Sequence, residues 1–145
     1  MSMRHTIEFD YENRWAVTAF HGPVSIPEAA ALLRQAVSLP EWTPDWDRII
    51  DYSDGMLGDL DVEAIKAGKA VLGQILHEAY GDKPTLSAQV CADPMKLPLV
   101  EYWIGLGEAD YPASLQLFDT LAAAKAWLIA TRKAQGRGGD QAQPV

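Results

Sequence analysis

Hydrophobic and polar residues alternate with a period of two over the first part of the chain. Between residues 6 and 20 the apolar positions lie on either side of the polar segment 12–14. They are Ile7, Phe9 and Tyr11 before this segment, and Trp15, Val17 and Ala19 after it. A period of two is typical of a strand with one buried face, so the pattern predicts a β-hairpin over residues 6–20.

Two further segments combine a helix-capping signal with apolar residues spaced three and four apart. Ser25 and Glu28 match a capping box, in which each side chain satisfies a free amide at a helix start, and they predict a helix ending near Val37. Asp119 or Thr120 can cap a last helix that contains Leu121, Ala124, Trp127 and Leu128. Each of these helices presents an apolar face that can pack on a sheet.

The longest helical pattern covers about residues 62–80 and is followed by Gly81, a plausible C-terminal cap. Its inner face contains Val62, Ile65, Gly68, Leu72, Ile75, Leu76 and Ala79. Lys66 and Lys69 are expected to face water. This segment therefore predicts an amphipathic helix with one buried face.

Short apolar runs and one further helix complete the pattern. Strands are predicted at 48–52, 86–92 and 115–118, and a helix at about 97–106. The order of elements is ββαβαβαβα, with five strands and about four helices. Such alternation favours right-handed crossovers, so we predict an α/β sandwich with a mixed, mostly parallel five-stranded sheet. Residues 1–133 are expected to form a single domain, and 134–145 a flexible tail.

Composition narrows the classes of function. The chain has 145 residues and a formal net charge of −8, which opposes binding to nucleic acid or anionic membranes. The single cysteine, Cys91, cannot form an internal disulfide, and a buried, inert thiol is expected there. No apolar run is long enough to cross a bilayer, and residues 1–5 lack the apolar core of a signal peptide. A cytoplasmic protein is the resulting expectation.

Motifs of common enzymes and cofactor sites are missing from the sequence. It contains no P-loop, no GxGxxG fingerprint and no GxSxG elbow, and the three histidines lack the spacing of metal ligands. We therefore expect no cofactor, no metal and no enzymatic activity. A nucleophilic pair of Cys91 with a histidine stays open.

The segment after the third strand is rich in carboxylates. It contains four candidate site residues, Ser53, Asp54, Asp59 and Asp61. Asp59 or Asp61 can cap the following helix, where a negative charge is favoured by the helix dipole. Together with Asp51 these carboxylates could instead bind a cation, but their spacing does not match an EF-hand. General acid–base catalysis would require carboxylates in a cleft, for which the sequence has no further sign.

The order of elements, the segment IIDYS at 49–53 and the closing segment LQLFDTLAAAKAWL at 115–128 resemble the SpoIIAA-like group of the STAS superfamily. The resemblance covers roughly residues 6–130 and implies a non-enzymatic module. STAS domains that antagonise anti-sigma factors carry Asp-Ser-Ser-Gly, with a phosphorylated serine, at the start of the helix after the third strand. The matching positions here are Asp59-Leu60-Asp61-Val62, so both serines are missing. Kinase control is therefore not implied, although Asp61 could supply a fixed negative charge.

The helix at 97–106 is apolar on more sides than one sheet can cover. Neighbouring elements, a second copy of the chain, a membrane or an apolar ligand could cover the rest. The STAS-like fold is similar to the CRAL-TRIO fold, which binds apolar ligands, and this similarity implies a pocket beside the preceding helix. Its candidate lining residues are Val71, Ile75, Tyr102, Trp103 and Leu106.

Two main functions follow from these observations, and a third possibility, an enzyme using Asp59 or Asp61, depends on the density of carboxylates alone. The leading hypothesis is a regulatory module that binds an unknown cytoplasmic protein, or a second copy of itself, through the acidic segment and the helices beside it. The alternative is binding or carriage of an apolar small molecule or lipid in a CRAL-TRIO-like pocket. Much of either inference depends on fold analogy.

Overall fold

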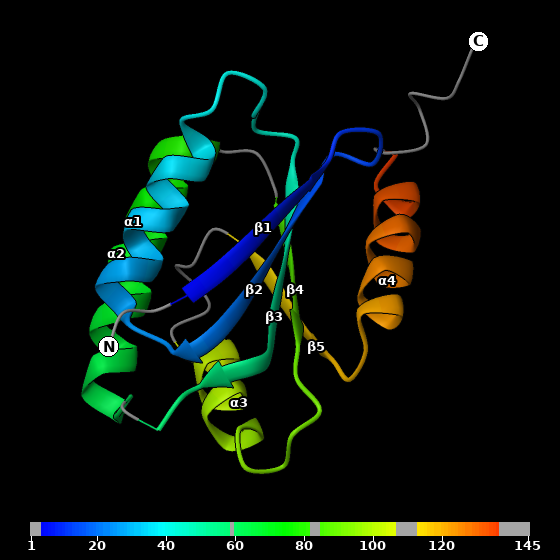
Figure 1. The fold of residues 1–145 in the computed structure, drawn as a ribbon. Helices are drawn as coiled ribbons and strands as arrows, with labels where there is room; N and C mark the ends of the chain where they lie inside the picture. The colour runs from blue at the N-terminus through cyan, green and yellow to red at the C-terminus, as the bar shows by residue number, and fades with distance from the viewer. Residues whose placement is uncertain (1–3, 59, 82–84, 107–112, 137–145) are drawn as a thin grey trace, which may run out of the picture.

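The computed structural model describes residues 4–58, 60–81, 85–106 and 113–136. Their elements follow the predicted order ββαβαβαβα (Figure 1). The strands are β1 (Arg4–Asp10), β2 (Trp15–Pro23), β3 (Asp47–Met56), β4 (Leu86–Val90) and β5 (Ser114–Phe118). The helices are α1 (Ile26–Val37), α2 (Val62–Tyr80), α3 (Leu97–Gly105) and α4 (Leu121–Ala134).

The five strands form one mixed sheet in the order β1-β2-β3-β4-β5. β1 and β2 are antiparallel, as the predicted hairpin requires, and the other neighbouring pairs are parallel. Because crossovers between parallel strands are right-handed and the strand order never reverses, the crossover helices share one face of the sheet. α1 and α2 lie on one side of the sheet and α4 lies on the other (Figure 1). The predicted α/β sandwich is confirmed.

Helix starts agree with their capping signals. The Ser25 side chain accepts a hydrogen bond from the Glu28 amide at the start of α1. The Thr120 side chain accepts one from the Ala123 amide at 3.1 Å, so Thr120 and not Asp119 is the N-cap of α4. Gly81 has a φ of +61°, a conformation that favours glycine after a helix.

The third strand is longer than the sequence predicts. The predicted strand covers 48–52, but β3 reaches Met56 because it continues to pair with β2 beyond an irregularity between Ala19 and His21. Ser53 and Asp54 therefore lie on a strand and not in a loop. Main-chain hydrogen bonds to β2 outweigh the polar character of this segment, which had indicated a loop.

Lys69 is buried, contrary to the prediction that it faces water. Its side chain is 5% exposed, and its ammonium group donates to the carbonyls of Trp103 and Ile104 at the end of α3. It also lies 5.2 Å from the centre of the Trp103 ring. A cation at the negative end of a helix is favourable, so Lys69 connects α2 to α3. The prediction was wrong because helical periodicity cannot show which helix packs over a polar position.

The ends of the chain are only partly described. α4 ends at Ala134, while residues 137–145 of the predicted tail lie outside the described residues, so the domain boundary at 133 stays a prediction. Within the described part, no helix has both the length and the apolar character needed to cross a membrane.

A buried ion pair joins α4 to the sheet. The Arg132 Nε donates to Asp47 Oδ2 at 2.7 Å, and both side chains are almost fully buried. The same guanidinium donates to the carbonyls of Asn13 and Arg14. The second oxygen of Asp47 accepts from the Leu86 amide at 2.9 Å. This network, which we name the Asp47–Arg132 network, connects residues 85 positions apart in the chain.

A more exposed ion pair forms between the β1–β2 turn and the connection before β3. Arg14 donates from Nε and Nη2 to the two carboxylate oxygens of Asp45, at 2.6 and 2.9 Å. The Arg14 guanidinium holds the pKa of Asp45 well below its ordinary value of 3.8. A carboxyl whose pKa is lowered by folding adds stability above its unfolded pKa, and that stability is lost as the pH falls toward the folded pKa.

We therefore expect Asp45→Asn to lower the free energy of unfolding by up to about 1 kcal/mol at pH 7, since half-exposed pairs are screened by water. The deficit should shrink as the pH is lowered below about 4. Urea unfolding of the wild-type and Asp45→Asn proteins at pH 7, 4 and 2.5 measures this difference in the free energy of unfolding. A deficit that does not change with pH would contradict an ionic contribution.

Candidate functional site

Two connections meet where the parallel strands end. The Lys96 ammonium, at the start of α3, donates to the carbonyls of Tyr52 at 3.1 Å and Ser53 at 2.6 Å. Lys96 is also 3.8 Å from a carboxylate oxygen of Asp93. The end of β3 and the connection from β4 to α3 are therefore held side by side.

Ser53 and Asp54, two of the predicted site residues, are exposed at this place. The Ser53 hydroxyl and amide both donate to Asp51 Oδ1, at 2.6 and 2.9 Å. Asp54 Oδ2 lies 3.3 Å from His21 Nδ1 on the neighbouring strand. The Ser53 hydroxyl is therefore bound within its own strand, whereas Asp54 presents its carboxylate on the surface.

Asp61 begins a helix. Its side chain accepts a hydrogen bond from the Ala64 amide at 2.8 Å, which confirms the interpretation that this carboxylate is an N-cap. Asp59 lies outside the described residues. Within the part of the chain that the structure describes, no three acidic, histidine or cysteine side chains are grouped so that they could hold a metal ion.

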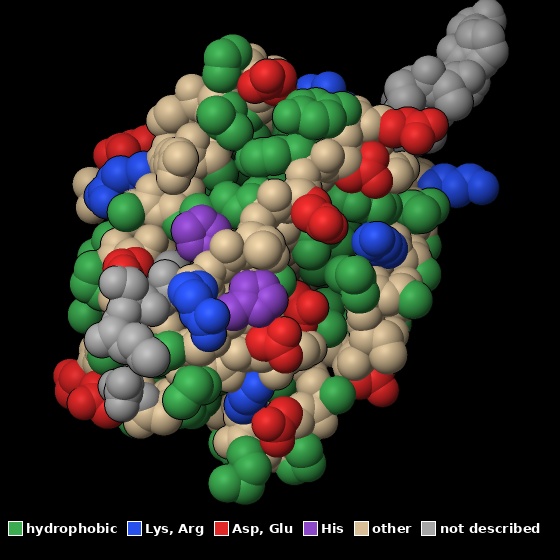
Figure 2. Space-filling view, in the orientation of Figure 1, with side chains coloured by type: hydrophobic (Ala, Val, Ile, Leu, Met, Phe, Trp, Pro, Cys, Tyr) green, Lys and Arg blue, Asp and Glu red, His purple; other side chains and the backbone are tan. Residues whose placement is uncertain are grey.

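Apolar side chains are exposed beside these carboxylates. Met95, next to Lys96, is 86% exposed, and Met56, at the end of β3, is 59% exposed. We name Ser53, Asp54, Met56, Asp61 and Met95 the carboxyl edge, because they lie in the last part of β3 or in the connections that follow β3 and β4. Hydrophobic, acidic and basic side chains lie next to one another at the bottom of the space-filling view, below the level of the sheet (Figure 2).

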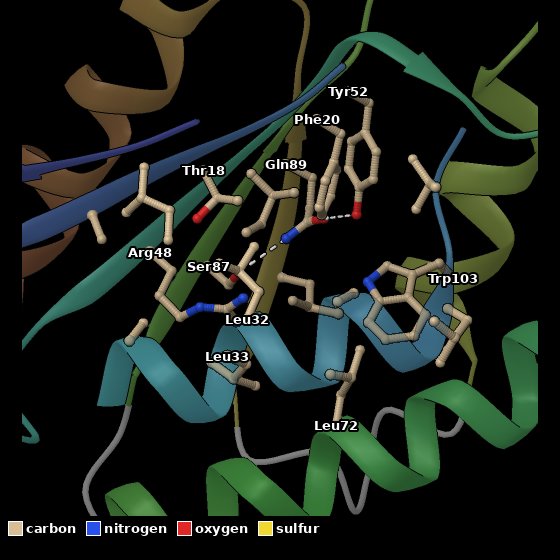
Figure 3. A pocket seen from close by; sticks show the side chains of 18 of the residues that line it. Thr18, Phe20, Leu32, Leu33, Arg48, Tyr52, Leu72, Ser87, Gln89 and Trp103 are labelled. Carbon is tan, nitrogen blue, oxygen red and sulfur yellow. Dashed lines mark hydrogen bonds between the residues drawn. The ribbon is translucent and has the colours of Figure 1, made fainter. Parts of the chain in front are cut away.

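A cavity of about 100 Å³ lies between the sheet and the helices of its α1 face. Its walls are mostly apolar, and they include Phe20, Ile50, Leu32, Leu33, Leu72 and Trp103 (Figure 3). A single water needs roughly 10–15 Å³ of such space, so the cavity is several times larger than one water. It lies between the two layers and is partly open to the surface.

Polar side chains from the central strands form part of the cavity wall. They are Thr18, Arg48, Tyr52, Ser87 and Gln89 (Figure 3). The Tyr52 hydroxyl donates to Gln89 Oε1 at 2.7 Å, and Gln89 Nε2 donates to the Ser87 hydroxyl at 2.9 Å. The dashed lines of Figure 3 mark these two bonds. We name these five residues the polar row.

The structure places the predicted pocket residues in different surroundings. Trp103 lines the cavity, but the other four are not among its lining residues. Val71 is 40% exposed, Ile75 is buried in a cluster with Leu33 and Leu76, and Tyr102 and Leu106 are half-buried. The cavity therefore lies mainly under α1, although residues of α2 and α3, among them Leu72 and Leu99, also line it.

Sequence reasoning did not single out the polar row. Ser87 and Gln89 lie in the strand predicted at 86–92, and every residue of β4 is buried, because helices cover both faces of this central strand. A polar pair on a strand placed between two helices of an α/β pattern is the signal that could have identified them.

The described residues cover α3 only partly. Val100 is buried, whereas Tyr102, Trp103 and Ile104 are half-buried. The apolar surface expected on this helix is therefore partly accessible. It continues toward the carboxyl edge through Lys96 and Met95.

Comparison with known proteins supports the fold. No family model matches the chain, and no curated protein matches it. A solved structure of an uncharacterised DUF3478-family protein from Shewanella loihica PV-4, described as having a SpoIIAA-like fold, is 18% identical. It matches over 87% of this chain and 93% of its own, with a TM-score of 0.50.

Two anti-sigma factor antagonists match to the same extent. Unphosphorylated SpoIIAA is 8% identical over 88% of this chain and 98% of its own, and a protein from Mycobacterium paratuberculosis is 18% identical over 86% and 92%. Both TM-scores are 0.50. The chain therefore has the SpoIIAA-like, STAS-type fold that its sequence resemblance implied.

Proposed function

We propose that this protein is a non-enzymatic regulatory module that binds a protein partner through the carboxyl edge. The observation that carries the proposal is the 86% exposure of Met95, whose neighbour Lys96 holds the start of the half-buried α3 against the end of β3. Exposed apolar side chains bordered by charges are typical of recognition surfaces, and methionine adapts well to a partner. Two solved proteins of the same fold are anti-sigma factor antagonists, which supports a protein as the ligand.

The charge of the chain indicates which partner surface would fit. The net charge is −8, and the carboxyl edge contains Asp54 and Asp61. Complementary charges increase association rates and select partners, so a basic surface with an apolar centre is the expected complement. Asp61 already serves as a helix cap, and both serines of the STAS motif are absent. The proposed interaction is therefore constitutive and not switched by phosphorylation at these positions.

Met95→Glu is expected to weaken partner binding about tenfold or more, because it places a charge at the apolar centre of the interface. The partner is first isolated with the intact protein as bait and identified by mass spectrometry. Its dissociation constant is then measured by calorimetry. Ile129→Glu, at a 55% exposed position of α4 on the other side of the sheet, is the matched control. Equal affinity of the two variants for the partner would show that the carboxyl edge is not part of the interface.

The acidic residues require variants that keep the fold intact. Asp61→Arg would remove the N-cap of α2 as well as its charge, so a loss of binding would be ambiguous. Asp61→Ser keeps a capping oxygen and removes only the charge. Asp54→Asn also removes only a charge, at an exposed position. We expect both variants to slow association in low salt while leaving the thermal midpoint within about 2 °C.

A second function is favoured by the cavity. The space between α1 and the sheet, with its mainly apolar walls, supports binding of an apolar small molecule as an alternative or additional role. Native mass spectrometry after purification, and after addition of alkyl probes, tests this role directly. The absence of any bound species in both preparations would count against it.

A further inference from the structure

The cavity under α1 contains hydrogen-bond donors that have no acceptor among the described residues. Neither the Thr18 hydroxyl nor the Arg48 guanidinium hydrogen-bonds to another side chain or carbonyl of the described part. Both residues line the cavity. A ligand entering this space would therefore meet unused donors, one of which is a guanidinium that cannot act as an acceptor.

The hydrogen-bonded part of the polar row has the same character. The Tyr52 hydroxyl donates to Gln89, whose amide donates in turn to Ser87. In this arrangement the Ser87 hydroxyl hydrogen and the second amide hydrogen of Gln89 are left over, because each group carries more hydrogens than the two bonds use. The Gln89 carbonyl oxygen and the Ser87 hydroxyl oxygen each accept one of these bonds. The row therefore presents surplus donors to the cavity.

Arg48 adds a positive charge to this row. It pairs in register with Ser87 across β3 and β4, so the two side chains leave the same face of the sheet next to each other (Figure 3). The neighbouring carboxylate of Asp47 belongs to the opposite face, where it is bound by Arg132. No ion pair joins Arg48 to any carboxylate of the described residues. Asp47 is also among the residues that line the cavity, but its carboxylate oxygens are bound by Arg132 and the Leu86 amide. Within the described residues, no carboxylate therefore pairs with the half-buried Arg48 guanidinium.

Apolar side chains form the opposite part of the cavity. In Figure 3, Trp103 and Leu72 lie at one end of the space, and the Arg48 guanidinium lies toward the other. Alkyl chains gain free energy when such walls replace water, whereas a guanidinium with its planar donors matches a carboxylate. The two ends thus suit the two ends of one amphiphilic molecule.

We propose that the cavity binds a monocarboxylate with a hydrocarbon chain, whose carboxylate pairs with Arg48 and the Ser87–Gln89 donors while its chain packs toward Trp103. This inference depends on the second function proposed above and gives that function a ligand class and an anchor. It does not depend on the protein partner at the carboxyl edge.

Matched probes separate the charge from the chain. Octanoate carries both features, 1-octanol keeps the chain without the charge, and octylammonium reverses the charge. Titration of the intact protein is followed by calorimetry and by tryptophan fluorescence, since Trp103 lines the cavity. We expect octanoate to bind at least about tenfold more tightly than 1-octanol, and octylammonium to bind most weakly.

Matched variants test the anchor. Arg48→Met keeps an extended side chain but removes the charge, and it should lower octanoate affinity about tenfold or more while leaving 1-octanol affinity unchanged. Arg34→Met removes an arginine from the exposed surface of α1 and should change neither. Gln89→Leu removes the amide donors and should weaken octanoate to a smaller extent. Circular dichroism confirms that each variant is folded, and Arg48→Lys provides a more conservative second variant.

The outcomes are distinguishable. If 1-octanol and octanoate bind equally, or if Arg48→Met weakens both probes alike, the carboxylate preference is overturned while an apolar carrier function stands. If neither probe binds the folded wild-type protein, both the ligand class and the carrier function are overturned. Selective loss of octanoate binding in Arg48→Met supports the proposal.

Discussion

Arg132→Met is expected to lower the free energy of unfolding by about 3–5 kcal/mol, because it leaves a buried carboxylate without its countercharge. Asp47 is fully buried, and its bonds to the Leu86 amide and the Thr85 hydroxyl supply no countercharge. The carbonyls of Asn13 and Arg14 would also lose their donors. Such a loss is a large part of the 5–15 kcal/mol that stabilises a typical domain.

Urea unfolding followed by tryptophan fluorescence measures this effect, and the thermal midpoint should fall by roughly 10–20 °C. Lys133→Met, one residue further along α4 and exposed, is the matched control and should stay within about 0.5 kcal/mol of wild type. The double variant Asp47→Asn/Arg132→Met should cost less than the sum of its single changes, since no charge is then left unpaired. Equal effects of Arg132→Met and Lys133→Met would show that the network contributes little.

Gly68→Ala is expected to destabilise the protein by about 1–3 kcal/mol, although alanine is the better helix former. Gly68 lies in α2 where it faces α1, and a Cβ placed on it would be 2.7 Å from Cγ2 and 2.9 Å from Cδ1 of Ile26. Two atoms of one branched side chain are too close, so Ile26 would have to move and the two helices separate. Helix propensity alone predicts the opposite sign, a gain of up to about 1 kcal/mol.

Gly105→Ala is the control for this substitution. Gly105 is the last residue of α3, and a Cβ there would meet no atom within 4 Å, so its replacement should be neutral or slightly stabilising. Combining Gly68→Ala with Ile26→Ala should remove most of the clash. Chemical denaturation of the wild type, Gly68→Ala and the double variant measures this compensation. A stabilising Gly68→Ala would mean that α1 and α2 are not packed as closely as described.

Local sequence was sufficient to predict much of the fold. Helix starts at Ser25 and Asp61 were recognisable because a capping side chain binds an amide only three residues away. The bounds of α2 were predicted correctly for the same reason, together with Gly81 at its end. The alternation around residues 12–14 likewise determined the β1–β2 hairpin, since its partners are close in sequence.

Features that depend on distant partners required the tertiary structure. Lys69 is buried because α3 ends beside it, and Arg132 is buried because Asp47 lies opposite it on β3. The polar row becomes a candidate site only when β3 and β4 pair in register and α1 closes over them. A hydrophobic pattern shows which side of a helix or strand is apolar. Which surface covers that side is decided by tertiary packing, because the residues that form it are far apart in the chain.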